Sequence, residues 1–230
     1  MVILALDTTA QTCAVALAKA GNGMSLLARR SETIGRGHAE RLMPMIGEAL
    51  AEAGLTYADL ERIAVTTGPG SFTGTRIGVA AARGLALALG IPAVGLSVLD
   101  ALIEAAGAKS DGVVVAALDA RRGEIYAKAS RAGSGTTMLE AQVTTAAALA
   151  RAIEGLNSEP VTLTGSAATE VARMLGEAGI VAAIAGQAAS ADIGTVAALA
   201  ALAKSGSPPV PLYLRPPDAK PQTGMAVARK

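Results

Sequence analysis

The chain has 230 residues, with 20 Lys and Arg against 19 Asp and Glu, one His, one Cys and no Trp. A formal net charge of +1 offers no concentrated positive surface for phosphates, so the composition argues against a dedicated nucleic-acid binder. One Cys cannot form an internal disulfide, and with one His it cannot complete a zinc site, so we expect a metal-free cytoplasmic protein.

The spacing of charges argues against a membrane span. The longest uncharged run, from Gly84 to Leu99, is interrupted by a turn at 90–92, whereas a spanning helix needs about 20 apolar residues. The N-terminus has no basic segment followed by a long apolar one, so we expect no secretory signal. Alanine accounts for 53 residues, and one Phe and three Tyr leave a core of small aliphatic side chains.

Short apolar runs and turn signals predict the elements of the first half of the chain. Pro44 either moves the start of the first helix to about Met43 or kinks that helix, and Ser97 can cap the last one. The expected elements are strands 2–7, 13–18 and 24–31, helix 37–53, strand 62–66, helix 75–89, strand 93–95 and helix 98–107.

The same succession of elements begins again in the second half, where residues 113–119 end in Asp as residues 2–7 do. A repeat at about 110 residues predicts two like units, 1–108 and 109–206. The expected elements are strands 113–119, 123–131 and 136–143, helix 145–154, strand 161–164, helix 166–177, strand 180–184 and helix 192–204.

The C-terminal segment, 207–230, differs from both units because six of the ten prolines fall between Pro208 and Pro221. Such a sequence is extended. Leu212, Tyr213 and Leu214 provide apolar anchors, so we expect the first part to lie on the body of the protein. Residues 218–230 are small and polar and are expected to be disordered.

Five segments together resemble the TsaB (YeaZ-like) family, in the order found there. They are ILALDTT at 3–9, GHAERLMP at 37–44, TTGPGSFTGTRIGVAAARGLA at 66–86, LDARRGEIYA at 118–127 and PLYLR at 211–215. The resemblance covers nearly the whole chain, and its most specific part is the GPGSFTGTRIG segment. It implies the actin-like ATPase fold of sugar kinases and actin-like chaperones, with two ribonuclease-H-like lobes, each with a mixed sheet and flanking helices.

The resemblance also implies a role in an assembly. Such proteins pair with a same-fold paralogue, TsaD, which carries the metal and transfers threonylcarbamoyl to N6 of adenosine 37 in tRNAs reading ANN codons. An ATPase, TsaE, completes the bacterial assembly. The chain is then a non-catalytic, partner-activating subunit that binds no cofactor alone, meets tRNA only through the complex and forms a homodimer without its partner. The family has also been described as glycopeptidases, which these residues do not support.

Asp7 and Asp119 are the candidate nucleotide-site acids, because kinases of this fold use an acid at the end of the first strand for the metal of ATP. The loop after Asp7 has no glycine and the loop after Asp119 has only Gly123. Since other residues rarely adopt positive φ, a phosphate-binding nest is hard to form. We expect both acids to be structural, bonding loop amides. Arg121 and Arg122 could hold either an anion or a carboxylate of the protein.

His38 cannot hold a catalytic metal alone. The metal-bearing paralogue uses two His residues four apart on a helix, and the fourth residue after His38 is Leu42. A Cys13–His38 nucleophile–base pair is disfavoured, because Cys13 shares a strand face with Val15 and Leu17. We expect His38 to be a solvated or interface residue near a helix start.

The glycine-rich loop has two open interpretations. It joins a strand to a helix N-terminus and carries hydroxyl groups, which suits an anion site, but no Walker Gly-Lys-Ser/Thr follows. The alternative is a tight turn in which glycines permit close backbone approach. Under the family resemblance, it shapes a partner-facing surface. Its residues are Gly68, Pro69, Gly70, Ser71, Phe72, Thr73 and Gly74.

Two helices are the candidate partner interface. Helix 75–89 is apolar around most of its circumference, and helix 37–53 is rich in Met, so core packing accounts for one face of each and an interface for the rest. The predicted contact residues are His38, Leu42, Met43, Met45, Ile46, Arg76, Gly78, Val79, Ala82 and Arg83. The alternative functions are a stand-alone kinase-like enzyme, which would need glycine-rich phosphate loops, and a purely structural homodimer.

Overall fold

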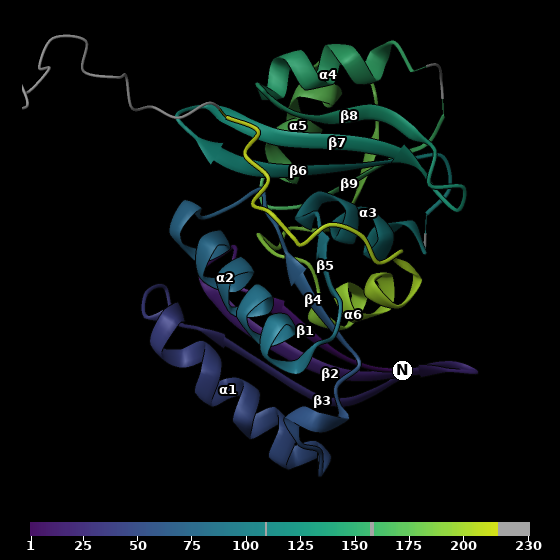
Figure 1. The fold of residues 1–230 in the computed structure, drawn as a ribbon. Coiled ribbons are helices and arrows are strands. Elements are labelled where there is room, and N and C mark those ends of the chain that lie inside the picture. Colours follow the sequence, from purple (N-terminus) through teal and green to yellow (C-terminus); the bar gives the residue numbers. More distant parts are fainter. Residues whose placement is uncertain (109, 157–158, 216–230) are drawn as a thin grey trace, which may run out of the picture.

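A computed structural model describes residues 1–108, 110–156 and 159–215, which form two five-stranded sheets (Figure 1). The first sheet has the order β3-β2-β1-β4-β5 and the second the order β10-β9-β6-β7-β8. In each sheet the first three strands are antiparallel, and the next two run parallel to the first. The predicted doubling of the topology is therefore confirmed.

The elements of the first half follow the predicted succession. They are β1 (Val2–Asp7), β2 (Thr12–Gly21), β3 (Gly23–Thr33), α1 (His38–Ala53), the 3-10 turn η1 (Tyr57–Asp59), β4 (Arg62–Thr66), α2 (Phe72–Leu89), β5 (Ala93–Leu96) and α3 (Val98–Gly107). Helix α1 runs through Pro44 without ending there, so the suggested start at Met43 is wrong. Helix α2 begins at Phe72, three residues before the predicted start at 75. The reason is that the Ser71 side chain caps the helix by accepting a hydrogen bond from Gly74 N.

The second half repeats this succession. Its elements are β6 (Val113–Arg121), β7 (Glu124–Arg131), β8 (Thr137–Thr144), α4 (Ala146–Glu154), β9 (Val161–Thr164), α5 (Ala168–Glu177), β10 (Ala182–Gly186) and α6 (Ile193–Leu202). Beyond α6, residues 203–215 are extended, as the prolines predict. The expectation for 218–230 lies outside the described residues. No helix in the described ranges has the length and apolar character needed to cross a membrane.

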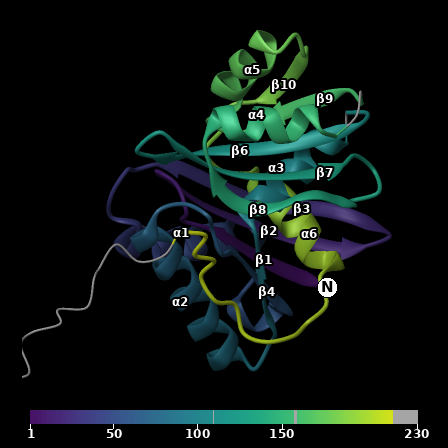
Figure 2. The ribbon, with the colours of Figure 1, turned by 90° about the horizontal axis from the view of Figure 1, so that it is seen from above.

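Five layers of helices and sheets make up the molecule (Figures 1 and 2). Helices α1 and α2 cover the outer face of the first sheet, and α4 and α5 cover that of the second. Helices α3 and α6 lie between the sheets, but α3 packs on the second sheet and α6 packs on the first. The predicted boundary at 108/109 therefore separates the strands of the two sheets but does not separate the two lobes as they pack. Each sheet is covered on its inner face by a helix from the other half of the chain.

We use "first lobe" for β1–β5 with α1, α2 and α6, and "second lobe" for β6–β10 with α3, α4 and α5. The chain crosses from the first lobe to the second at Ser97, before α3. It returns through residues 187–192, before α6. The extended residues 203–215 then leave the end of α6.

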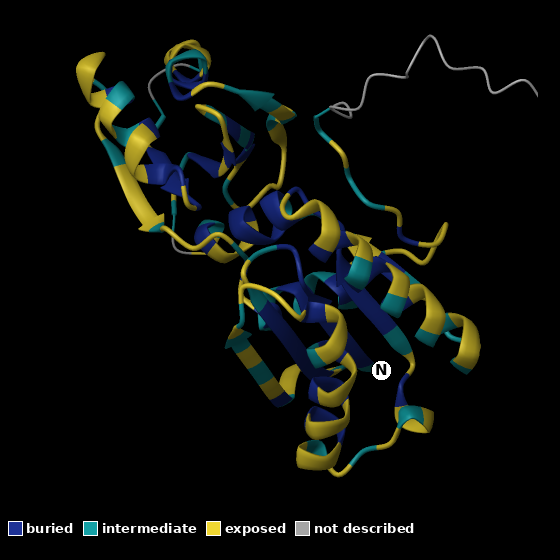
Figure 3. Ribbon diagram, turned by 90° about the vertical axis from the view of Figure 1, so that its left-hand side faces the viewer, coloured by how far each residue is buried: buried dark blue, intermediate teal, exposed yellow. Residues whose placement is uncertain are grey.

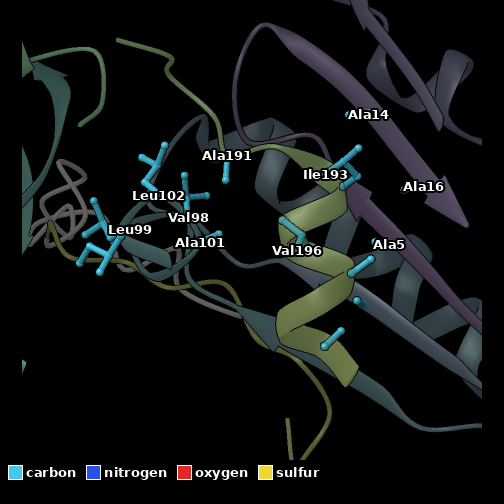
Figure 4. Packing of buried hydrophobic residues seen from close by; sticks show 14 of the residues in the cluster. Ala5, Ala14, Ala16, Val98, Leu99, Ala101, Leu102, Ala191, Ile193 and Val196 are labelled. Atoms are coloured by element: carbon cyan, nitrogen blue, oxygen red, sulfur yellow. The ribbon is translucent and has the colours of Figure 1, made fainter. Parts of the chain in front are cut away.

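The central core explains the abundance of alanine. Strands β1 and β2 turn Ala5, Ala14 and Ala16 towards α6, whose Ile193 and Val196 lie against them (Figure 4). The opposite faces of these strands carry larger side chains, such as Leu4 and Leu17, which pack under α1 and α2. Because side chains alternate between the faces of a strand, small residues on one face let α6 approach closely while large ones fill the outer core.

Both ends of α6 are tied to the first sheet. At its start, Asp192 Oδ1 accepts hydrogen bonds from Gly194 N at 2.8 Å and Thr195 N at 3.3 Å, while Arg29 pairs with the same carboxylate at 2.6 Å. At its end, Arg62 NH1 donates to the carbonyl oxygens of Ala200 and Ala203. A cation there satisfies carbonyls that the helix leaves without partners.

The Arg62 contacts generate a stability prediction. Replacing Arg62 with Met keeps the apolar stem but removes both donors, and we expect unfolding to become easier by about 1–3 kcal/mol. Urea denaturation of the purified chain measures the difference. Arg173→Met on α5, where the arginine is exposed and pairs with Glu177, is the control and should change stability by less than about 0.5 kcal/mol. Equal effects of the two substitutions would show that Arg62 does not hold α6.

Candidate functional site

Asp7 lies at the carboxyl end of β1 and is buried. Its Oδ1 accepts three hydrogen bonds, from Thr9 N at 2.8 Å, from Thr9 Oγ1 at 2.6 Å and from Thr66 Oγ1 at 2.6 Å. These bonds join the ends of β1 and β4 to the loop between β1 and β2. One oxygen of this carboxylate is therefore engaged by the chain's own groups, which is the loop-bonding arrangement that the sequence predicts for a structural acid.

The glycine-rich loop packs directly on the loop after Asp7. A Cβ on Gly70 would lie 2.3 Å from Thr9 O, and one on Gly74 would lie 2.0 Å from Thr8 O. Thr8 Oγ1 donates to Gly74 O at 2.7 Å, and Ser71 N donates to Thr9 O at 2.6 Å. Close backbone approach thus accounts for these glycines, which favours the tight-turn interpretation over the anion site.

Two glycines within α2 have different surroundings. A Cβ on Gly78 would lie 2.5 Å from Thr8 Oγ1 and 3.3 Å from Val65 Cγ2, whereas Gly84 has no neighbour within 4 Å. Gly78 is therefore needed by the chain's own fold. Gly84 is exposed in a helix interior, where glycine costs about 1 kcal/mol relative to alanine, and no contact within the described residues requires it.

The two glycines provide a matched pair of substitutions in one helix. We expect Gly78→Ala to destabilise the protein by about 1–3 kcal/mol, because the added methyl overlaps a buried threonine. Gly84→Ala should stabilise it by about 0.5–1 kcal/mol, because it removes backbone freedom without a clash. Thermal and urea unfolding of both variants measure the changes. A destabilised Gly84→Ala variant would contradict the open environment of that position.

In the second lobe, Asp119 lies at the equivalent strand end but is exposed. Its Oδ1 accepts a hydrogen bond from Arg121 N at 2.6 Å, and its own N–H donates to Ser166 Oγ at 3.0 Å. Arg121 and Arg122 have φ of 63° and 60°, so these non-glycine residues adopt the left-handed conformation that the sequence disfavours. Such backbone costs about 1–2 kcal/mol per residue and persists only where its surroundings hold it.

His38 begins α1 and is buried, with 7% of its surface exposed, so the expected solvated position is wrong. Its Nε2 has no hydrogen-bond partner among the described residues. Leu42, one helical turn later, is buried in the outer core of the first sheet. Within residues 1–108, 110–156 and 159–215, no three His, Cys, Asp or Glu residues are grouped closely enough to hold a metal ion.

Cys13 is buried in the same outer core. Burial raises the pKa of its thiol from 9.0 to about 11, and the nearby Arg41 opposes this shift only in part. The thiol is therefore protonated at neutral pH, whereas the thiolate is the nucleophilic form. This chemistry does not support the Cys13–His38 nucleophile–base pair.

The predicted interface residues divide into buried and exposed groups. Met43, Arg76 and Arg83 are exposed, whereas seven others lie under the chain's own side chains: His38, Leu42, Met45, Ile46, Gly78, Val79 and Ala82. These seven cannot line a surface patch, so their assignment to the interface is corrected. The sequence showed that both helices are largely apolar, but it could not show which side of each helix faces the sheet.

The exposed side of α2 is a regular stripe that sequence reasoning missed in part. Arg76, Ala80, Arg83 and Leu87 are exposed at spacings of four, three and four residues, and Leu87 is 86% exposed. This spacing keeps side chains on one helix face. The two arginines at Arg76 and Arg83 were the sequence signal for this face, because they lie seven residues apart, about two helical turns.

Helix α1 is held against β3 by an ion-pair network. Arg41 donates to Glu32 Oε2 at 2.8 Å and to Glu48 Oε1 at 2.7 Å, and Arg30 pairs with Glu52 at 2.7 Å. The hydrogen bonds from Arg41 lower the pKa of both Glu32 and Glu48 below the ordinary value. The network fixes α1 beside the exposed stripe of α2 on the outside of the first lobe.

Comparison with known proteins places this geometry in a family. A family model described as TsaD, tRNA N6-adenosine threonylcarbamoyltransferase, matches residues 31–206. A Pseudomonas aeruginosa crystal structure described as similar to peptidase YeaZ is 30% identical, with a TM-score of 0.76, over 93% of this chain and 99% of that one. The chain belongs to the TsaB/YeaZ family. The actin-like fold that the resemblance implies is thereby confirmed.

Relatives of this family differ in how much of their length is matched. The tRNA threonylcarbamoyladenosine biosynthesis protein TsaB of Escherichia coli is 40% identical over 127 residues, which is 55% of this chain and 53% of that protein. The chain thus matches about half the length of such curated relatives. An uncharacterized Mycobacterium tuberculosis H37Rv protein is 36% identical over 223 residues, 95% of this chain and 94% of that one.

Proposed function

We propose that the chain is a non-catalytic, partner-activating subunit of the machinery that forms N6-threonylcarbamoyladenosine at position 37 of tRNAs reading ANN codons. The observation that carries this proposal concerns the loop between β1 and β2, which in kinases of this fold binds phosphate. In this chain, the polar groups of that loop are bonded to other residues of the chain. Asp7 Oδ1 is engaged by Thr9 and Thr66, and the glycine loop lies against Thr8 and Thr9. The TsaB names of the curated relatives supply the pathway.

The chemistry is assigned to the partners. The proposed transferase is a TsaD-like paralogue of the same fold, which carries the metal ion and a helical His pair that Leu42 replaces here. A TsaE-like ATPase supplies nucleotide hydrolysis, and tRNA is bound through the complex in the cytoplasm. A stand-alone kinase of this fold is the alternative, and it would need phosphate-binding glycines where this chain has Thr8 and Thr9.

The partner-binding surface is assigned to the outer sides of α1 and α2. Figure 3 shows helices that are exposed on their outer sides, whereas the central strands β1, β2 and β4 of the first sheet are largely buried. The α2 stripe combines Arg76, Arg83 and Leu87, and arginine is enriched in the central residues of interfaces. Gly47 on α1 and Gly84 on α2 are both exposed, and a Cβ added to either would meet nothing within 4 Å outside its own helix backbone. Glycines that the fold does not need permit a partner helix to approach closely.

A second copy of the chain is the proposed occupant of this surface when the partner is absent. Two like folds can meet through equivalent faces, so a homodimer and the heterodimer with the paralogue should compete. A purely structural homodimer is the remaining alternative function. It predicts self-association without any affinity for a same-fold partner.

Ala80→Glu tests the surface, because Ala80 lies in the middle of the α2 stripe and is exposed in the free chain. The variant should fold normally. We expect it to lose at least about tenfold in affinity for the paralogue, because an unpaired charge would be buried on association. Ala152→Glu, at an exposed position of α4, is the matched control and should bind as the original chain does.

Analytical ultracentrifugation gives the self-association of each variant, and a reconstituted modification assay with the paralogue, the ATPase, ATP and tRNA gives function. A folded Ala80→Glu protein with unchanged paralogue affinity would place the interface elsewhere. Full modification of tRNA by the paralogue and the ATPase without this chain would refute the activating role.

Because Asp7 and the loop after it are bonded within the chain, we also expect weak or absent nucleotide binding by the isolated chain. Isothermal titration with ATP and Mg²⁺ should give no saturable heat at micromolar concentrations, and incubation should release no phosphate. The paralogue, titrated in parallel, is the positive control. Stoichiometric micromolar binding by the chain alone would favour the kinase-like alternative.

A further inference from the structure

The extended residues 203–215 run from the end of α6 along the first lobe to the second (Figure 1, yellow). They make the third crossing between the lobes, after Ser97 and residues 187–192. Pro208, Pro209 and Pro211 favour the stiff polyproline conformation, so ordering this segment costs less entropy than ordering a flexible linker. It is therefore suited to hold two parts at a set distance.

The segment is anchored firmly to the first lobe. Pro209 is buried against β5, where a Cβ on Gly95 would lie 3.1 Å from Pro209 Cβ. Leu212 N donates to Thr67 O at 2.7 Å, immediately beyond the end of β4. Backbone bonding and a buried ring fix the path of the chain without depending on any charged pair.

An aromatic cluster extends this anchor to α2. Arg76 Nε donates to Tyr213 Oη at 2.7 Å, and the Arg76 guanidinium lies 3.7 Å from the centre of the Phe72 ring. The rings of Phe72 and Tyr213 are 5.5 Å apart. Cation–π and tilted ring contacts of this kind each add modest stabilisation at an exposed site.

The side chain of Arg215 makes the polar contacts that the segment forms with the second lobe in the described part of the chain. Arg215 NH2 donates to Ala120 O at 3.0 Å and forms an ion pair with Glu124. Ala120 and Glu124 flank the turn in which Arg121, Arg122 and Gly123 all have positive φ. The contact thus reaches the second lobe at a strained turn, while Pro209, Leu212 and Tyr213 are anchored on the first lobe and Leu214 packs against the central core.

We propose that residues 203–215 are a latch that restrains rotation of the second lobe relative to the first, and that the Arg215 contact with Ala120 and Glu124 is its releasable end. The crossings at Ser97 and 187–192 are short connections at the ends of elements, which is where hinge residues are found. The latch adds a restraint between the lobes beyond the central core. This inference concerns the chain alone and does not depend on the proposed function.

A spin-label distance measurement tests the latch. Labels at Ala51→Cys on α1 and Ala152→Cys on α4 are both on exposed helix positions, one in each lobe. The native Cys13 is buried and protonated, so it is not labelled in the folded chain. Dilution with unlabelled protein restricts the signal to distances within one chain. The latched protein should give one narrow distance distribution.

Charge reversal of either partner should release the latch. Arg215→Glu and Glu124→Arg should each shift the ratio of latched to open chains by about threefold or more, since an exposed ion pair changes an equilibrium by up to about fivefold and reversal adds repulsion. The distribution should broaden and gain a second distance. The double variant, Arg215→Glu with Glu124→Arg, should narrow it again in part, because the ion pair returns but the bond to Ala120 O does not.

A matched control separates the latch from a general effect of charge. Arg173 and Glu177 form an exposed pair within α5 of the second lobe, so reversing either should leave the distance distribution unchanged. Two outcomes would overturn the proposal. One is a single narrow distance distribution in both Arg215→Glu and Glu124→Arg. The other is a double variant as broad as the single variants, because the pair would then not be what restrains the lobes.

Discussion

The packing of two helices between two sheets is the constraint on which the rest of the structure depends. Helix α6 contacts the first sheet and α3 contacts the second, and the two helices share one continuous core. Each half of the chain therefore completes the other half's lobe, so neither half by itself covers both faces of its own sheet. The alanines of β1 and β2 make this possible, because a helix can approach a sheet closely only where the facing side chains are small.

This core fixes the ends of the strands, and the positions of the strand ends decide which polar groups meet there. Thr66 at the end of β4 is held beside Asp7 at the end of β1, so its hydroxyl takes a place that a ligand could otherwise use. The glycines of the following loop then press against Thr8 and Thr9. In the first lobe, the carboxylate of Asp7 at one strand end is thus bonded to hydroxyl and amide groups of the neighbouring strand end and loop.

The same constraint leaves the outer sides of α1 and α2 largely exposed in the described part of the chain. Both helices bury one face on the first sheet, and the ion pairs of Arg41 hold α1 in place. Because no further layer covers them in the described part of the chain, their outer residues are exposed. The extended residues 203–215 meet α2 at Arg76, so the outer surface of the first lobe and the connection to the second lobe share one side chain.

The sequence alone determined the doubled succession of strands and helices, because apolar periodicity records which residues of an element are buried. It also identified the glycine-rich loop and the extended proline segment, since Gly and Pro act on the local backbone. Only the tertiary structure decided that α3 and α6 pack on the lobe formed by the other half of the chain. It also decided that Ala82 faces the core while Ala80 faces outward, and that Arg215 reaches Glu124. A helix that is apolar nearly all round does not record which neighbour covers each side, and contacts between residues about 90 positions apart leave no local pattern.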